Sequence, residues 1–97
     1  MNTQSIERDH PGAHLVDRDE WEVIGQGFQL SPRELSVLML FFEGNPYRQI
    51  ARELSITPRT VRHHIEHIHR KLAVCDQVEL VLAVIEARDE LRQVTVV

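Results

Sequence analysis

The stretch RQIARELSITPRTVRHHIEHIHRK (48–71) carries the clearest structural signal, because it divides into two helices joined by SIT. Thr57 is an expected N-cap, and Pro58 suits the first position of the second helix. Between Thr57 and Lys71 stand four histidines, three arginines and one lysine. Four apolar residues recur at 3.6-residue spacing and predict the core face of this helix: Val61, Ile65, Ile68 and Leu72.

A helix-turn-helix is predicted by three residues that lie five apart, Ala51, Ile56 and Val61. The small Ala51 allows the two helices to approach, Ile56 fills the turn and Val61 fixes the second helix. The outer face of helix 58–72 is mixed but mostly basic. From charge alone, a solvated surface helix is an equal alternative to a binding face.

Helix-start signals divide the rest of the chain into further helices. They predict helices over 18–26, 32–42, 46–54 and 77–92, and no useful stretch alternates with the period of a strand. We therefore expect an all-α fold of four helices plus one short N-terminal helix. Residues 1–14 are expected as a flexible tail, 15–29 as the extra helix and linker, and 30–97 as the main domain. The start signals are Asp17 with Glu20, Ser31 with Glu34, Asn45 with Pro46, and Asp76 with Glu79.

The charge of the chain is unevenly distributed. The net charge is −4, yet residues 30–74 hold seven basic and four acidic residues. Residues 1–29 hold six acids and two arginines, and residues 75–97 hold five acids and two arginines. A basic block between acidic flanks indicates an anionic partner that the overall charge conceals.

Composition excludes several classes of function. The apolar runs 37–42 and 80–85 are too short to cross a bilayer, which needs about 20 apolar residues, so no membrane partner is expected. Cys75 is the single cysteine and cannot form an internal disulfide, which favours a reducing cytoplasm. No catalytic constellation, glycine-rich phosphate loop or cysteine cluster is visible, so neither an enzyme nor a cofactor is expected.

Residues 30–74 resemble the LuxR-type (GerE-like) DNA-binding domain. The matching stretches are LSPRELSVLMLFFEG, RQIARELSITPRTVRHHI and IHRKLAV, and DQVELVLAV is similar to the family's fourth helix. The resemblance implies a helix-turn-helix fold with helix 58–72 in the major groove of double-stranded DNA. It further implies activation or repression of transcription and dimerisation through the last helix.

By position, the resemblance implies that Arg62, His63 and Glu66 lie at base edges. Thr60, His64 and Arg48 would contact or approach the phosphate backbone. Physically, Arg62 can bind guanine and Glu66 can accept from cytosine. Further phosphate neutralisation is expected from Arg59, Arg70 and Lys71.

The histidines admit three interpretations. His63 and His67 have the i, i+4 spacing of a zinc chelate, although no third ligand accompanies them. Protonation near neutral pH would strengthen DNA binding. Plain hydrogen bonding to DNA or solvent is the default, and no metal is predicted.

The last helix is apolar around most of its circumference, so one face needs a partner. We predict a homodimer through this helix, and the alternative is that helix 18–26 with Trp21 covers the face instead. The expected interface residues are Val78, Val81, Leu82, Val84 and Ile85.

The sequence as a whole favours a homodimeric transcriptional regulator, either a stand-alone protein or an output domain. RNA polymerase or another regulator is a further candidate partner. The rival hypothesis is a protein-interaction module that captures another regulator through its apolar last helix. The acidic balance of the chain and Glu66 favour that rival.

Overall fold

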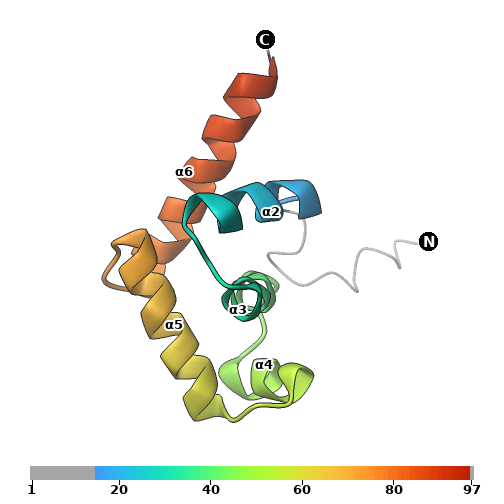
Figure 1. Ribbon diagram of the computed structural model, residues 1–97, viewed down its shortest axis with the longest axis vertical. Coiled ribbons are helices and arrows are strands. Elements are labelled where there is room, and N and C mark those ends of the chain that lie inside the picture. Colours follow the sequence, from blue (N-terminus) through green and yellow to red (C-terminus); the bar gives the residue numbers. More distant parts are fainter. Residues whose placement is uncertain (1–14, 97) are drawn as a thin grey trace, which may run out of the picture.

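Five helices make up the part of the chain described by the computed structural model, residues 15–96 (Figure 1). No strand occurs in this part, so the predicted all-α fold is confirmed. The predicted tail, residues 1–14, lies outside the described residues. The helices are α2 (Arg18–Gly27), α3 (Pro32–Phe42), α4 (Tyr47–Leu54), α5 (Pro58–Leu72) and α6 (Gln77–Val96).

The predicted capping boxes form as hydrogen-bonded pairs. Ser31 Oγ accepts the N–H of Glu34 at 3.1 Å, and Glu34 Oε1 accepts the N–H of Ser31 at 2.9 Å. Glu20 Oε1 accepts the N–H of Asp17 at 2.9 Å in the same way. These local bonds satisfy donors that the first turn of a helix leaves unpaired, which explains why α2 and α3 begin where they do.

The prediction that Asn45 begins a helix is wrong. Pro46 occupies the N-cap position of α4, and the Asn45 side-chain amide donates to the Leu40 carbonyl at 2.9 Å. Gly44 has a φ of 92°, a left-handed conformation that suits glycine after a helix. Gly44 and Asn45 together therefore terminate α3.

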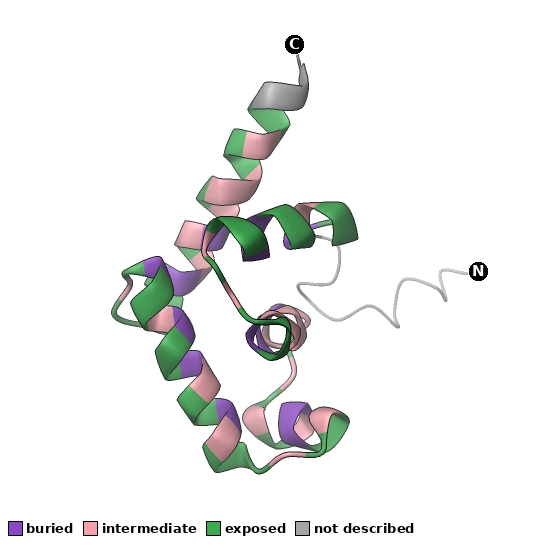
Figure 2. Ribbon diagram, in the orientation of Figure 1, coloured by how far each residue is buried: buried purple, intermediate pink, exposed green. Residues whose placement is uncertain are grey.

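Helix α3 lies at the centre of the fold, with α2, α4 and α5 around it (Figures 1 and 2). Its buried apolar residues are Val37, Leu38 and Phe42. Trp21 of α2 packs edge-on against Phe42, with ring centroids 5.1 Å apart and an interplanar angle of 82°. The extra N-terminal helix is therefore part of the hydrophobic core.

The helix-turn-helix has the predicted arrangement. Ala51 and Val61 are buried, and the N–H of Ile56 bonds to the Ala51 carbonyl at 2.9 Å. Ser55 ends α4 with a φ of 58°, in the left-handed region that reverses the chain. The predicted core stripe of α5 is buried throughout its length.

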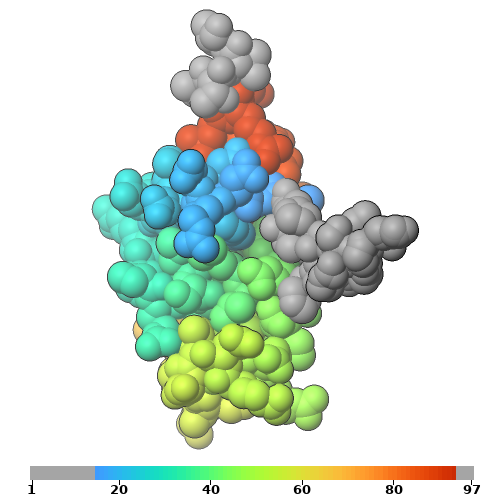
Figure 3. All heavy atoms as spheres, turned by 90° about the vertical axis from the view of Figure 1, so that its right-hand side faces the viewer, coloured from blue at the N-terminus to red at the C-terminus, as the bar shows by residue number. Residues whose placement is uncertain are grey.

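Helix α6 extends away from the body of the domain, and α2 packs against it (Figures 1 and 3). Arg92 forms an ion pair with Glu20 at 2.8 Å, and Arg88 donates to the Leu15 carbonyl at 3.0 Å. The alternative that α2 covers one face of the last helix is therefore correct for part of it. The helix was expected to end near Arg92, but no glycine or proline follows, and it continues to Val96.

One residue of the predicted dimer interface faces inward. Val84 and Leu80 are completely buried in the domain core. Val84 is therefore unavailable to a partner chain, and its predicted interface role is wrong. None of the described helices is long and apolar enough to cross a membrane.

Candidate nucleic-acid interface

The exposed face of α5 gathers five polar residues into one stripe opposite the buried one. The residues recur at helical spacing, so they lie on successive turns of the same face. Exposed and buried positions alternate along α5 (Figure 2). The stripe, called the outer face of α5 below, consists of Arg59, Arg62, His63, Glu66 and Arg70.

Two further predicted contact residues flank this face and are half-buried. Thr60 donates its backbone N–H to Thr57 Oγ1 at 3.1 Å, and the two hydroxyl oxygens are 2.9 Å apart. The hydroxyl of Thr60 is thus held at the start of α5. His64, on the next turn, is also half-buried, so only part of its ring is accessible.

Helix α4 presents its own arginines beside α5. Arg48 and Arg52 are both exposed, and Arg48 lies in the first turn of α4. Arg33 of α3 donates to the Leu54 carbonyl at 3.3 Å, which ties the start of α3 to the end of α4. The guanidinium of Arg33 therefore has a structural role.

Glu34 is the one buried charged residue among those described, and it connects three parts of the fold. Its carboxylate accepts from Lys71 Nζ at 2.8 Å and from the Ser31 N–H at 2.9 Å. Lys71 Nζ also donates to the Gln29 carbonyl at 2.9 Å. The last turn of α5 is thus fixed to the start of α3 and to the linker before it.

The pKa of Glu34 reflects two opposing effects. Burial raises the pKa, but the hydrogen bonds from Lys71 and from the Ser31 backbone outweigh it, so the pKa lies below its ordinary value. His67 Nδ1 lies 3.7 Å from the carboxylate. Glu34 is therefore a stable carboxylate at neutral pH.

This arrangement gives Lys71 a different role from the predicted phosphate contact. Its ammonium group is engaged within the domain by Glu34 and by Gln29. Sequence reasoning missed the pair because its members are 37 residues apart. One local signal existed, since Glu34 stands three and four residues before the buried Val37 and Leu38 and so on the same face.

The helices differ in charge. In α4 and α5, six arginine and lysine residues accompany two acids, whereas α2 and α6 together contain seven acids and three arginines. The predicted basic block therefore corresponds to the helix-turn-helix. The two acidic helices, α2 and α6, pack against each other.

Residues 28–84 match the family described as bacterial regulatory proteins, luxR family. The chain belongs to this family. The match includes α3, α4 and α5 completely, together with the first part of α6. Helix α2 and the rest of α6 lie outside the match. The match begins at Phe28, the first residue of the linker between α2 and α3.

The relatives of this luxR-family chain are described as regulators. The chain is 40% identical to the nitrate/nitrite response regulator protein NarL of Escherichia coli K12 over 60 residues. The aligned segment is 62% of this chain and 28% of NarL. Identity to the transcriptional regulatory protein LiaR of Bacillus subtilis is 44% over 50 residues, or 52% of this chain and 24% of LiaR. Identity to the transcriptional activator protein CarR of Pectobacterium carotovorum is 47% over 45 residues, or 46% of this chain and 18% of CarR.

The aligned segment is therefore less than a third of each of these relatives. No solved structure matches the chain significantly. Family and relatives together support a DNA-binding domain of the kind found in transcription regulators.

The Glu34–Lys71 pair predicts a specific pH dependence of stability. A carboxyl whose folded pKa is lowered stabilises the fold above its unfolded pKa of about 4.3, and that contribution is lost as pH falls through the folded pKa. Glu34→Gln should therefore lower the free energy of unfolding at pH 7 by about 1–3 kcal/mol. It should also flatten the decline of stability below pH of about 5, as measured by urea unfolding at several pH values.

Some acid sensitivity should remain in Glu34→Gln, because the hydrogen bond to Arg92 also lowers the pKa of Glu20. Glu22→Gln, at an exposed position of α2, is the matched control and should change stability at pH 7 by less than about 0.5 kcal/mol. If the free energy of unfolding depended on pH in the same way in wild type and Glu34→Gln, the proposed role of the Glu34–Lys71 pair would be contradicted.

Proposed function

We propose that the protein binds specific DNA sequences as a homodimer, with the outer face of α5 in the major groove. The observation that carries the proposal is the mainly basic stripe on one fully exposed helix face, whose opposite face is buried. A helix of this kind fits the width of the major groove, where base pairs are distinguishable. Membership of the luxR family supports the same mode of binding.

Base reading is assigned to Arg62, His63 and Glu66, in the middle of the outer face. Arg62 and Glu66 are four residues apart, so their side chains reach neighbouring positions along the groove. A guanidinium can bind guanine with two hydrogen bonds, and a carboxylate can accept from the cytosine amino group. Glu66 repels phosphate, so it favours selective binding over strong non-specific binding.

Phosphate contact is assigned to side chains near the edges of this surface, where they position the protein without reading sequence. Arg48 reaches the backbone from the first turn of α4. Lys71 is left out of this set, since its ammonium already binds Glu34. The remaining members of the set are Arg59, Thr60, His64 and Arg70.

Reading and phosphate contact should respond differently to mutation. Arg62→Ala should cost about 1–3 kcal/mol on the preferred site and relax the choice of base at one position. Arg48→Ala should weaken all sequences similarly and reduce the salt dependence by about one ion. Selection of sites from random DNA, followed by affinity measurements at several salt concentrations, distinguishes the two effects.

Glu66→Lys is the complementary variant, and it should raise non-specific affinity and change the selected bases. If wild type binds no DNA at low salt, the DNA-binding proposal is wrong. Equal loss of affinity on all sequences in Arg62→Ala would remove this arginine from base reading.

The homodimer is proposed through the outward side of α6. Val78 and Leu82 are 69% and 55% exposed, which is unusual for two large apolar residues one helical turn apart. Val81 and Ile85 are half-buried beside them, and Phe41 and Gln77 complete the lining of a shallow hollow with Val78, Val81 and Leu82. Two copies of this surface would cover each other across a two-fold axis.

A double substitution tests this contact. Val78→Glu with Leu82→Glu should give a monomer in sedimentation equilibrium, because four carboxylates would be brought together across the axis. The matched control is Val23→Glu, an exposed valine on α2, which should leave the association constant unchanged. Wild type that is monomeric at high micromolar concentration, both free and on DNA, would contradict the proposed dimer.

The same apolar surface also suits an alternative function, in which the protein captures another regulator through α6. That alternative predicts unchanged biological output in Arg62→Ala. RNA polymerase remains a further candidate partner. A chromosomal DNA partner would place the protein in the cytoplasm.

A further inference from the structure

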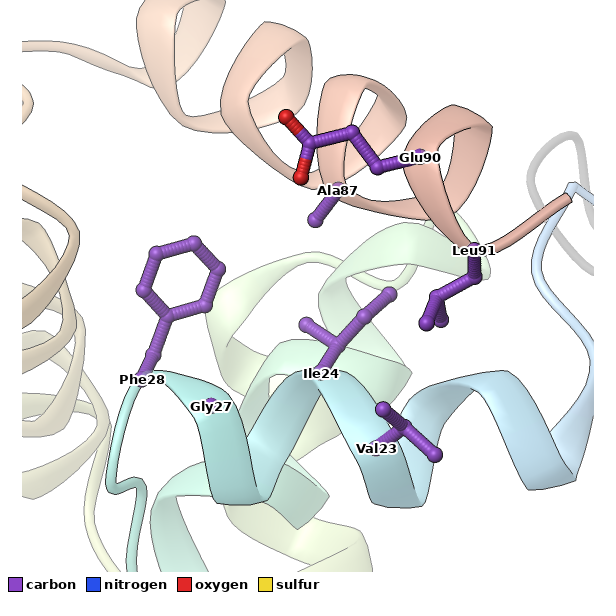
Figure 4. A pocket seen from close by; sticks show the side chains of 7 residues that line it. All are labelled: Val23, Ile24, Gly27, Phe28, Ala87, Glu90 and Leu91. Carbon is purple, nitrogen blue, oxygen red and sulfur yellow. The ribbon is translucent and has the colours of Figure 1, made fainter. Parts of the chain in front are cut away.

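A second apolar hollow lies between α2 and the C-terminal half of α6 (Figure 4). Its volume is about 340 Å³, and it is open to solvent on one side. The side chains of Ile24 and Leu91 point into the space between the two helices, Val23 lies beside them on α2, and Phe28 closes one end. We call this feature the α2–α6 groove, with Gly27, Ala87 and Glu90 as its remaining lining residues.

Two features suit the groove to receive side chains from another molecule. A Cβ placed on Gly27 would meet no atom within 4 Å, so the space above this residue is unfilled. The side chain of Val23 lines the hollow and is 49% exposed, and a side chain entering the hollow would cover it. A hydrophobic groove of this kind can accept the apolar face of an amphipathic helix.

The groove is maintained by contacts outside the part of the chain that matches the luxR family. Arg92 binds both carboxylate oxygens of Glu20, at 2.8 and 3.1 Å, and Arg88 donates to the Leu15 carbonyl. The Glu20–Arg92 pair joins α2 to α6, and the Arg88 bond joins α6 to the segment before α2. Six of the seven residues that line the groove lie outside the part of the chain that matches the family.

The charge around the groove is acidic. The Glu90 carboxylate extends over Ala87 at the mouth (Figure 4). Among the described residues, Glu90 is the one charged residue that lines the groove, and α2 and α6 together contain seven acids and three arginines. A partner that brings basic residues beside its apolar ones would complement this surface.

We propose that the α2–α6 groove binds an apolar and basic helical segment of a protein partner. One or two large apolar side chains would occupy the space above Gly27 and Ala87, and a flanking lysine or arginine would pair with Glu90. The outer face of α5 and the groove are formed by different helices, with α5 contributing no lining residue. Partner binding is therefore compatible with simultaneous DNA binding, and it goes beyond the proposed DNA-binding function.

The test uses a display library of random 16-residue peptides, about the length of a four-turn helix, selected on the full chain. Enriched peptides should carry two apolar residues three or four apart, with lysine or arginine nearby. In amide NMR spectra, the best peptide should shift the signals of Val23, Gly27, Ala87 and Glu90. Gly27→Leu fills the empty space and should weaken that peptide by about tenfold, or 1.4 kcal/mol.

Two controls separate the groove from other surfaces. Gly27→Leu should keep wild-type DNA affinity, so failure of DNA binding and failure of peptide binding are distinguishable. Glu90→Lys should weaken basic peptides while leaving the circular dichroism spectrum unchanged. The proposal is overturned if no peptide is enriched, if enriched peptides lack basic residues, or if they bind Gly27→Leu as tightly as wild type.

Discussion

The structure depends most on one buried carboxylate, Glu34. A charge removed from water must be paired, because an uncompensated buried charge costs several kcal/mol. Lys71 and the Ser31 N–H supply that pairing, and Lys71 extends it to the Gln29 carbonyl. The position of α5 on α3 is fixed by this contact at one end and by the buried stripe along its length. The Glu34–Lys71 pair therefore fixes the last turn of α5, and the buried stripe decides which residues of α5 face outward.

Local features of the fold were predictable because their causes are local. Capping boxes at Ser31 and Asp17 act over three residues, and the core stripe of α5 follows from helical spacing. Contacts between distant segments were not predictable in the same way. The Glu34–Lys71 and Glu20–Arg92 pairs join residues far apart in the chain, and the sequence pattern specifies neither partner. Val84 was assigned outward for the same reason, since an apolar helix does not reveal which of its faces is covered.

In the candidate site, too, local features could be predicted from the sequence and contacts between distant residues could not. Helical spacing sufficed to place Arg62, His63 and Glu66 on one exposed face, whereas the structural role of Lys71 required the fold. The domain also has two electrically distinct regions, a basic helix-turn-helix and an acidic pair of helices. DNA repels the acidic region, so the protein is favoured to approach DNA with α5 facing it. The extra helix α2 thus completes the core, adds negative charge away from α5 and forms a groove with α6.

The most direct test of the central claim is a methylation-protection map of a selected DNA site bound by the wild-type protein. Dimethyl sulfate modifies guanine N7, which lies in the major groove. If α5 reads bases as a dimer, guanines in two symmetric half-sites should be protected, with the half-sites separated by about one helical turn of 10 bp or a multiple of it. Unprotected guanines at a site of full occupancy would contradict major-groove reading by α5. Protection confined to a single half-site would contradict the dimer.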